Sequence, residues 1–246
     1  MITSIQNNLV KEWRKLHTRK HRVRKQQFLI EGFHLIEEAH YSGWELETVI
    51  IQNGITYPTW VNDYHTNLVN ERVFKEISQT ETPQGIAAVV HMKALTKQHD
   101  SFFILLIDAI QDPGNLGTII RTADAAGFSQ IILGTGTVDL YNDKVIRASQ
   151  GSIFHIPIKQ AVLSQKIAEL KEENYTVWAS GLTNGVDINS LKIHGKTALI
   201  LGNEGAGISE EILKAVNGIV KIPMYGKAES LNVSVAAGIL MYNMRK

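Results

Sequence analysis

The most informative stretch for the fold is residues 221–242, which read KIPMYGKAESLNVSVAAGILMY. The β-branched run Gly218–Met224 predicts a short buried strand, and Pro223 closes it because proline has no N–H for a ladder hydrogen bond. From Leu231 onward small residues alternate with aliphatic ones, which predicts a helix apolar nearly all round, in the core or at an interface. A polar loop between two apolar elements indicates a site, and Ser230 is a candidate N-cap of the helix.

The chain has 246 residues, 44% of them hydrophobic, and can bury a sizeable core in one large or two small domains. No segment reaches the roughly 18 apolar residues of a membrane span. Residues 1–8 also lack the charged-then-apolar order of a secretion signal, so we expect a cytoplasmic protein without a membrane partner. The absence of cysteine excludes disulfides, thiolate nucleophiles and cysteine-ligated metals. No cluster has metal-ligand spacing, so we expect no metal site.

The charge is distributed unevenly along the chain. Residues 1–30 carry eight Lys or Arg and a single acid, Glu12, so that this segment holds +7 and the remainder −6 of the net +1. A solvated face usually mixes signs, so the segment is better interpreted as a phosphate-binding surface with nucleic acid as partner. The candidate contacts are Arg14, Lys15, Arg19, Lys20, Arg22, Arg24 and Lys25.

Two domains are predicted. The first hundred residues contain strand candidates at 28–30, 46–51 and 85–90 and helical stretches at 31–41 and 70–77, which indicates a small α/β domain over residues 1–95. A polar linker is expected at residues 96–101. The second domain, residues 102–246, alternates buried strands with helices, which predicts an α/β fold with a mainly parallel sheet. Its strand candidates are 102–107, 130–133, 176–179, 197–201 and 218–222.

Ligands of such sheets bind at the carboxyl ends of the strands, where three strands here are followed by polar loops. In the first loop, residues 108–115, Pro113 and Gly114 form a turn and Asn115 can cap the next helix. Arg121 lies one turn beyond Gly117 on the same face, from which its guanidinium could reach a phosphate or a developing oxyanion.

The second loop, residues 202–207, places three glycines around Asn203 and Glu204, so its backbone can approach a ligand closely. The loop matches neither the phosphate-binding G-x-x-x-x-G-K-[ST] nor the dinucleotide-binding G-x-G-x-x-G pattern, and it comes late in the chain. A kinase, a GTPase and a nicotinamide oxidoreductase are therefore disfavoured. The third loop is 224–230, within the stretch quoted first.

Together the loops resemble the three signature motifs of the SpoU, or TrmH-like, RNA ribose methyltransferases of the SPOUT superfamily. The matching residues are Asn115 with Arg121, then Gly202-Asn203-Glu204, then Ile222-Pro223 followed by Ser230-Leu-Asn-Val-Ser234. Residues 28–39, FLIEGFHLIEEA, are similar to the L30e-like substrate-binding domain that precedes many members. The resemblance implies a carboxyl-terminal trefoil knot, an exception to the usual unknotted topology, and a homodimer formed through the knotted domain.

The resemblance also implies a reaction and a cofactor: methyl transfer from S-adenosylmethionine to a ribose 2′-OH, a group that distinguishes RNA from DNA. Backbone groups of Gly202, Ile222 and Leu231 are the expected cofactor contacts. The remaining candidates for that pocket are Ser180, Gly181, Asn203 and Met224.

Five residues are candidates for the chemistry. A guanidinium has no free lone pair at neutral pH, so Arg121 is expected to hold the nucleotide phosphate and stabilise the forming alkoxide, with the proton passing to phosphate or water. Asn115 would orient Arg121 or the ribose, Glu204 would fix its loop or contact Arg121, and Ser230 with Asn232 would shape the site. Asn115 and Ser230 could instead be only helix caps, and Glu204 only an acceptor for loop N–H groups.

Ribosomal RNA, 23S in particular, is the expected substrate, because the L30e-like fold recognises structured RNA. Two alternatives stay open: a tRNA 2′-O-methyltransferase, and a non-catalytic RNA-binding or ribosome-assembly protein with a decayed site. The combination of Asn115, Arg121 and Asn232 favours an enzyme.

Overall fold

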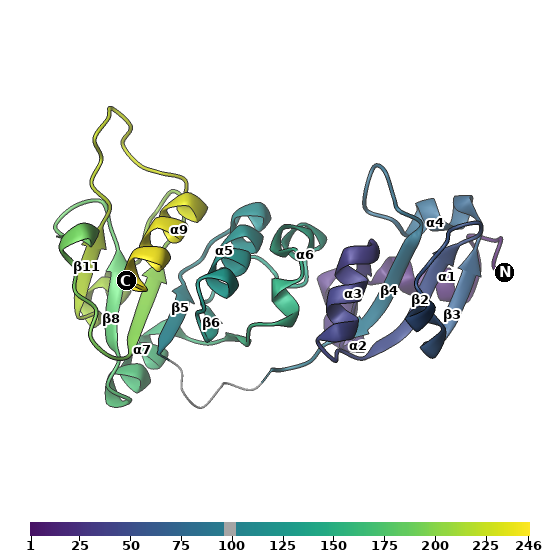
Figure 1. The fold of residues 1–246 in the computed structure, drawn as a ribbon, viewed down its shortest axis with the longest axis horizontal. Coiled ribbons are helices and arrows are strands. Elements are labelled where there is room, and N and C mark those ends of the chain that lie inside the picture. Colours follow the sequence, from purple (N-terminus) through teal and green to yellow (C-terminus); the bar gives the residue numbers. More distant parts are fainter. Residues whose placement is uncertain (96–101) are drawn as a thin grey trace. The chain divides into compact units, whose positions relative to one another are not determined.

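The computed structural model describes residues 1–95 and 102–246, so the predicted linker at 96–101 lies outside the described residues. The chain divides into two compact units. Unit 1 comprises Met1–Lys93 and Asp139–Phe154, and unit 2 comprises Ala94–Val138 and His155–Lys246. Figure 1 shows the elements of both. No helix among the described residues is long and apolar enough to cross a membrane.

The described part of unit 1 is built on a four-stranded sheet in the order β1-β4-β2-β3, in which β4 runs antiparallel to both neighbours. Helices α1 and α4 pack together on one face, and α3 packs on β1 and β4 (Figure 1). The elements are α1 (Asn8–Lys15), α2 (Arg19–Lys25), β1 (Gln27–Glu31), α3 (Phe33–Tyr41), β2 (Leu46–Gln52), η1 (Thr59–Asp63), β3 (Thr66–Val69), α4 (Glu71–Ile77), β4 (Ile86–His91), α6 (Asp143–Ser149) and η2 (Ser152–Phe154).

The segment Asp139–Phe154 belongs to unit 1 in the structure, although the sequence pattern placed it within 102–246. The reason is packing: the ring of Phe28 on β1 contacts those of Tyr141 and Phe154, at centroid distances of 4.5 and 6.4 Å. Phe154 also accepts a hydrogen bond at its backbone oxygen from the indole of Trp44. Strand periodicity in β1 shows that one face is buried but not which distant segment covers it.

Unit 2 contains, within the described residues, a seven-stranded sheet in the order β7-β6-β5-β10-β8-β11-β9, and every paired neighbour is parallel. This confirms the predicted α/β class with a mainly parallel sheet. The elements are β5 (Phe103–Ile107), α5 (Pro113–Ala125), β6 (Gln130–Leu133), β7 (Ile158–Gln160), α7 (Leu163–Glu172), β8 (Thr176–Ser180), β9 (Val186–Asp187), η3 (Ile188–Ser190), β10 (Thr197–Leu201), α8 (Glu210–Ala215), β11 (Gly218–Lys221) and α9 (Val233–Met244).

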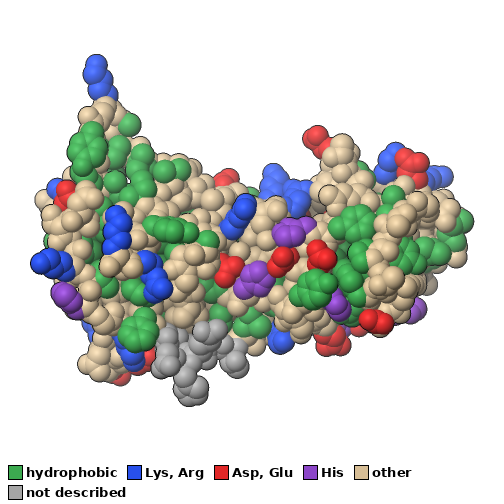
Figure 2. Space-filling view, viewed as in Figure 1, with side chains coloured by type: hydrophobic (Ala, Val, Ile, Leu, Met, Phe, Trp, Pro, Cys, Tyr) green, Lys and Arg blue, Asp and Glu red, His purple; other side chains and the backbone are tan. Residues whose placement is uncertain are grey.

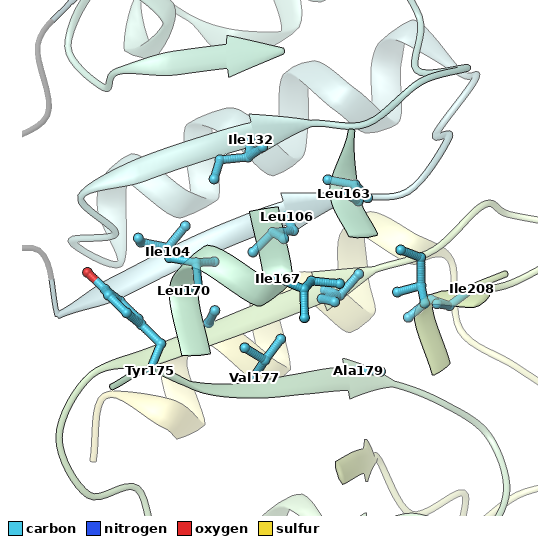
Figure 3. Packing of buried hydrophobic residues seen from close by; sticks show 13 residues of the cluster. Ile104, Leu106, Ile132, Leu163, Ile167, Leu170, Tyr175, Val177, Ala179 and Ile208 are labelled. Carbon is cyan, nitrogen blue, oxygen red and sulfur yellow. The ribbon is translucent and has the colours of Figure 1, made fainter. Parts of the chain in front are cut away.

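Helices cover both faces of this sheet. Helices α5 and α9 lie side by side on one face (Figure 1), and α7 contacts α8 on the other. Figure 3 shows the second face, where alternate residues of the strands, such as Ile104 and Leu106 on β5, pack against Ile167 and Leu170 of α7. Strands buried on both faces are continuous apolar runs, which explains why β5 and β10 were predicted almost to the residue.

Differences from the predicted elements are local. Three short strands, β3, β7 and β9, have no counterpart among the candidates, because two to four residues carry too little periodicity. Glu31 ends β1 rather than starting a helix, since Gly32 adopts φ +96° and α3 begins at Phe33. Strand β11 ends at Lys221, before Pro223.

Candidate functional site

The three polar loops meet at the carboxyl edge of the parallel sheet in unit 2. Strands β5 and β10 are neighbours with Ile107 opposite Leu201, so the loops after them, residues 108–112 and 202–209, start side by side. The third loop, residues 222–232, leaves β11 and returns to α9, which packs against α5. Parallel strands place their carboxyl ends at one edge, and the described helices begin there.

A continuous path of hydrogen bonds connects the three loops. The side chain of Asn115 donates to Oε1 of Glu204 across 3.1 Å, and the side chain of Asn232 donates to Oδ1 of Asn115 across 3.1 Å. Asn232 Oδ1 in turn accepts from the backbone N–H and the hydroxyl of Ser234. The structure therefore brings three of the five predicted catalytic residues together.

Glu204 fixes the first loop to the second. Its carboxylate accepts from the backbone N–H groups of Gln111 and Asp112 at 3.3 Å, in addition to Asn115. Partial burial by itself raises the pKa of Glu204, but the hydrogen bonds from Asn115 and from backbone N–H groups outweigh it and lower the pKa below its ordinary value. Glu204 is thus held as an anion, and of its two predicted roles the loop-fixing contact is observed. Within the described residues no hydrogen bond or ion pair joins it to Arg121.

The helix caps differ from those predicted. Asp112 caps α5 by accepting from the backbone N–H of Asn115 at 2.7 Å, and Pro113 occupies the first turn. An Asp directly before a Pro was the sequence signal for this cap. Asn232, not Ser230, caps α9, which leaves Ser230 exposed and without a hydrogen bond to the described chain. Because Asn115 does not cap α5, its side chain remains available to connect the other loops.

The second loop is held in a tight turn by Gly202 and Asn203. A Cβ on Gly202 would lie 2.5 Å from the carbonyl carbon of Gly207, so no larger residue fits there. The Asn203 side chain donates to Ala109 O at 2.8 Å and accepts from Gly205 and Ala206. Its side-chain groups are therefore used within the protein. The backbone N–H and C=O groups of Asn203 and Gly207 also bond to each other, at 2.9 and 3.0 Å, which fixes the turn.

Arg121 stands on α5 as an exposed side chain with no hydrogen-bond or ion-pair partner in the part of the chain that the structure describes. A guanidinium at a ligand-binding edge with no protein anion opposite it is available for an external phosphate or oxyanion. Among the described residues, no hydrogen bond or ion pair joins Arg121 to the path of Asn115, Glu204 and Asn232.

The third loop suits a ligand held by backbone groups. Residues 223–231 make no hydrogen bond with any other described residue, so their N–H and C=O groups are available. The loop projects away from the sheet in Figure 1, and Figure 2 shows hydrophobic side chains along it with a basic side chain at its outer end. Ile222, Met224 and Leu231 are half-buried in it.

The end of β8 lies beside the start of this loop. Ser180 is the last residue of β8, and the backbone N–H of Gly181 donates to Val220 O on β11 at 2.9 Å. A Cβ on Gly181 would lie 2.6 Å from Ile219 Cγ2, which explains the glycine. The third loop offers unbonded backbone groups and half-buried apolar side chains, and Gly181 and Gly202 are closely packed. Together these features fit a nucleoside-type cofactor such as S-adenosylmethionine. No three His, Asp or Glu side chains among the described residues are grouped as a metal site requires.

The basic segment of unit 1 folds into α1 and α2, and its cations divide into paired and unpaired groups. Arg14 pairs with Glu76 at 3.2 Å, and Lys15 and Lys25 approach Glu12 at 2.7 and 3.9 Å. Lys20 and Arg24 are exposed and face no acid in the described residues.

Arg22 was predicted to contact RNA at the protein surface, but its side chain is buried. It is 6% exposed, donates to the backbone oxygens of Leu16 and His17 at 2.8 Å, and forms an ion pair with Asp139, which Arg19 also approaches at 3.9 Å. Charge counting cannot separate such a buried arginine from exposed neighbours, since the partner acid is more than a hundred residues away.

Solved structures of other proteins share this fold. The chain superimposes on an AdoMet-bound rRNA methyltransferase from Sinorhizobium meliloti with a TM-score of 0.89 at 32% identity, covering 99% of this chain and 96% of that one. The SpoU methyltransferase AviRb from Streptomyces viridochromogenes, in complex with AdoMet, gives a TM-score of 0.88 at 27% identity, over 98% and 97% of the two chains. The fold and the site therefore define an α/β methyltransferase of the SPOUT class.

Sequence comparison gives the family. The SpoU rRNA Methylase family matches residues 102–242, and the MRM3-like substrate binding domain matches residues 7–88. A 23S rRNA (guanosine(2553)-2′-O)-methyltransferase of Bacillus subtilis (strain 168) is 45% identical over 99% of this chain and 98% of its own length. The chain belongs to the SpoU rRNA methylase family, and it is an RNA ribose 2′-O-methyltransferase that uses S-adenosylmethionine.

Proposed function

We propose that this enzyme methylates a ribose 2′-OH of 23S ribosomal RNA. The observation that carries the proposal is the hydrogen-bonded connection of Glu204, Asn115 and Asn232, together with an exposed Arg121 on α5 that has no partner among the described residues. The Bacillus subtilis relative supports 23S rRNA as the target and makes the guanosine equivalent to its position 2553 the first nucleotide to test.

Arg121 acts on the RNA in this proposal. Its guanidinium holds the nucleotide phosphate and stabilises the 2′-oxygen as that oxygen loses its proton, which passes to phosphate or water. Asn115 and Asn232 set the position of the ribose, because each amide is fixed by its neighbour in the path. Ser230 lies at the exposed entrance, where it can contact the RNA without disturbing the cap of α9.

Backbone groups of Gly202, Ile222 and Leu231 hold the cofactor, with Ser180, Gly181, Asn203 and Met224 completing the pocket. S-adenosylmethionine, when bound, supplies a methyl group on a sulfonium that needs no further activation. The protein's contribution is then to place the hydroxyl in line and to exclude competing nucleophiles.

The assembly in this proposal is a cytoplasmic homodimer formed through a carboxyl-terminal trefoil knot. Val235 and Tyr242 on α9 are 51% and 54% exposed, which is high for apolar residues on a helix that packs against α5. A second copy covering them would remove this apolar surface from water. The division into a substrate-binding domain at 1–95 and a catalytic domain at 102–246 belongs to the same proposal, with α1 and α2 binding RNA.

The test is incubation of the purified protein with methyl-labelled S-adenosylmethionine and, separately, ribosomal RNA and tRNA from cells that lack it, followed by nucleoside analysis. Label in one 2′-O-methylated nucleotide of 23S rRNA, lost in Arg121→Ala, is the expected result. Label in tRNA would overturn the assignment of ribosomal RNA as the substrate. Cofactor binding without label on any RNA, including assembly intermediates, would contradict catalysis and favour an RNA-binding role.

A further inference from the structure

A cavity of about 280 Å³ opens in unit 1 between α1, α2 and one end of the four-stranded sheet. Its floor is apolar and formed by Trp13, Leu16 and Val89, each less than 5% exposed. Its rim is polar and includes Gln27 and His65. All the residues that line it belong to unit 1, so this cavity is distinct from the three-loop site in unit 2.

The polar side of the cavity is fixed by hydrogen bonds around a β-bulge. The register of β2 against β4 shifts between Leu46 and Thr48, and bulges commonly re-aim a side chain beside a functional site. The buried Thr48 hydroxyl donates to His65 O at 2.9 Å and accepts from the side-chain amide of Asn67 at 2.9 Å. Asn67 is therefore held in one orientation, and its Oδ1 receives no donor from the described residues.

The imidazole of His65 is exposed and has no hydrogen-bond or ion-pair partner in the described part of the chain. A free ring and a fixed amide oxygen at the mouth of an apolar cavity are what a flat ligand with a hydrogen-bonding edge requires. The volume is just below the roughly 300–1,000 Å³ of pockets for drug-sized ligands, so one ring system fits better than a larger molecule.

The charges around the cavity suit a polyanion. Its two carboxylates are already occupied, because Glu12 accepts from Lys15 and His21 at 2.7 and 3.2 Å and Glu47 accepts from His91 at 2.7 Å. The helices that form its wall also carry Lys20 and Arg24, which are exposed and face no acid in the part of the chain that the structure describes. A phosphate chain running along α2 would thus lie next to the opening.

We propose that this cavity receives one unpaired nucleobase of the RNA substrate, which lies over the apolar floor beside His65 and presents its edge to Asn67. Unpaired bases are the parts of RNA that side chains can both stack on and read by hydrogen bonds. The proposal rests on the proposed function only in taking RNA as the ligand. It adds a second, base-contacting site in the substrate-binding unit, away from the methyl-transfer site.

The test compares the full-length protein binding a labelled single-stranded decaribonucleotide of mixed sequence with its binding of a fully paired RNA duplex. In the wild type we expect the single strand to bind more tightly. His65→Ala should weaken single-strand binding about fivefold or more, the lower end of what loss of one base–ring contact produces, and leave duplex binding unchanged. Thr66→Ala is the matched control, because Thr66 directly follows His65 but is not among the residues that line the cavity.

Two results would overturn the proposal: His65→Ala binding the single strand as the wild type does, or an equal loss for single strand and duplex. Asn67→Asp gives a second variant. It keeps the side-chain shape but replaces the amide with a negative charge that repels the single-stranded RNA. Methyl transfer and S-adenosylmethionine binding are measured on the same preparations. If the protein methylates RNA but His65→Ala has no effect on single-strand binding, only the proposal of a base pocket is contradicted. If His65→Ala weakens single-strand binding but no RNA is methylated, only the proposed function is contradicted.

Discussion

Asn232 donates its side-chain N–H to Oδ1 of Asn115 across 3.1 Å, although 117 residues separate the two in the chain. Asn232 also caps α9, and Asn115 also holds Glu204. One amide pair therefore ties the start of the last helix to the first and second loops. The arrangement makes the geometry of the site depend on side chains that have no need to touch the cofactor.

The first prediction concerns this pair. Asn232→Asp retains an oxygen that caps α9, so the fold should persist. It loses the N–H that donates to Asn115, so the third loop should no longer be held to the first. Because one hydrogen bond contributes about 1 kcal/mol net, we expect S-adenosylmethionine to bind about fivefold more weakly, measured by calorimetry. Ser234→Ala, which leaves the Asn232–Asn115 bond intact, is the control. Unchanged affinity in Asn232→Asp would show that the pair does not position the loop.

The second prediction concerns Arg121. Lysine keeps the charge but offers a single point donor, so Arg121→Lys should lower kcat about 100-fold, as expected for loss of one oxyanion-stabilising donor. The melting temperature should not change, because Arg121 is exposed and has no partner among the described residues. Thr118→Ala, also exposed on α5, is the control in the methylation assay. A lysine variant with most of its activity would rule out bidentate contact.

The third prediction concerns RNA affinity. Lys20 and Arg24 are exposed and unpaired among the described residues, so the double variant Lys20→Ala/Arg24→Ala should reduce the slope of log K against log salt by roughly 1.4 to 1.8. The slope comes from a salt titration of RNA binding by fluorescence anisotropy. An unchanged slope would mean that the RNA phosphates do not contact Lys20 and Arg24.

The fourth prediction concerns the buried ion pair. Arg22→Met leaves Asp139, whose side chain is 17% exposed, without its main partner and should destabilise unit 1 by about 3–5 kcal/mol in urea unfolding. Adding Asp139→Leu should restore most of that loss, because a well-packed apolar pair can replace a buried ion pair. If the double variant is as unstable as the single one, the hydrogen bonds of Arg22 to Leu16 and His17 account for the stabilisation instead.

The fifth prediction concerns pH. Burial lowers the pKa of His17 in the folded protein, although its hydrogen bond to Ile77 O opposes the shift. The unfolded chain therefore binds a proton more readily, so stability should fall as pH drops from 7 through the unfolded value of about 6.5. Thermal unfolding between pH 7.5 and about 5.5 should show this slope, and His17→Gln should flatten it. A His17→Gln protein with the wild-type slope would assign the effect to other groups.

The sequence by itself determined the parallel sheet of unit 2 and the three loops. Continuous apolar runs such as 103–107 and 197–201 identify strands buried on both faces, and their loops must lie at one edge. The family resemblance was also readable, because the residues that carry each motif lie within about a dozen positions of one another in the sequence.

Tertiary structure alone decided which side chains meet. The side chain of Asn232 meets that of Asn115, 117 residues away, and Asn115 meets Glu204, contacts that no local pattern shows. The cap of α5 by Asp112, by contrast, is a local contact with a sequence signal, an Asp directly before a Pro. Arg22 is buried against Asp139, and Tyr141 and Phe154 cover Phe28, in contacts between residues more than a hundred positions apart. Local pattern fixes which face of an element is apolar, but the partner for that face is selected by packing of the whole chain.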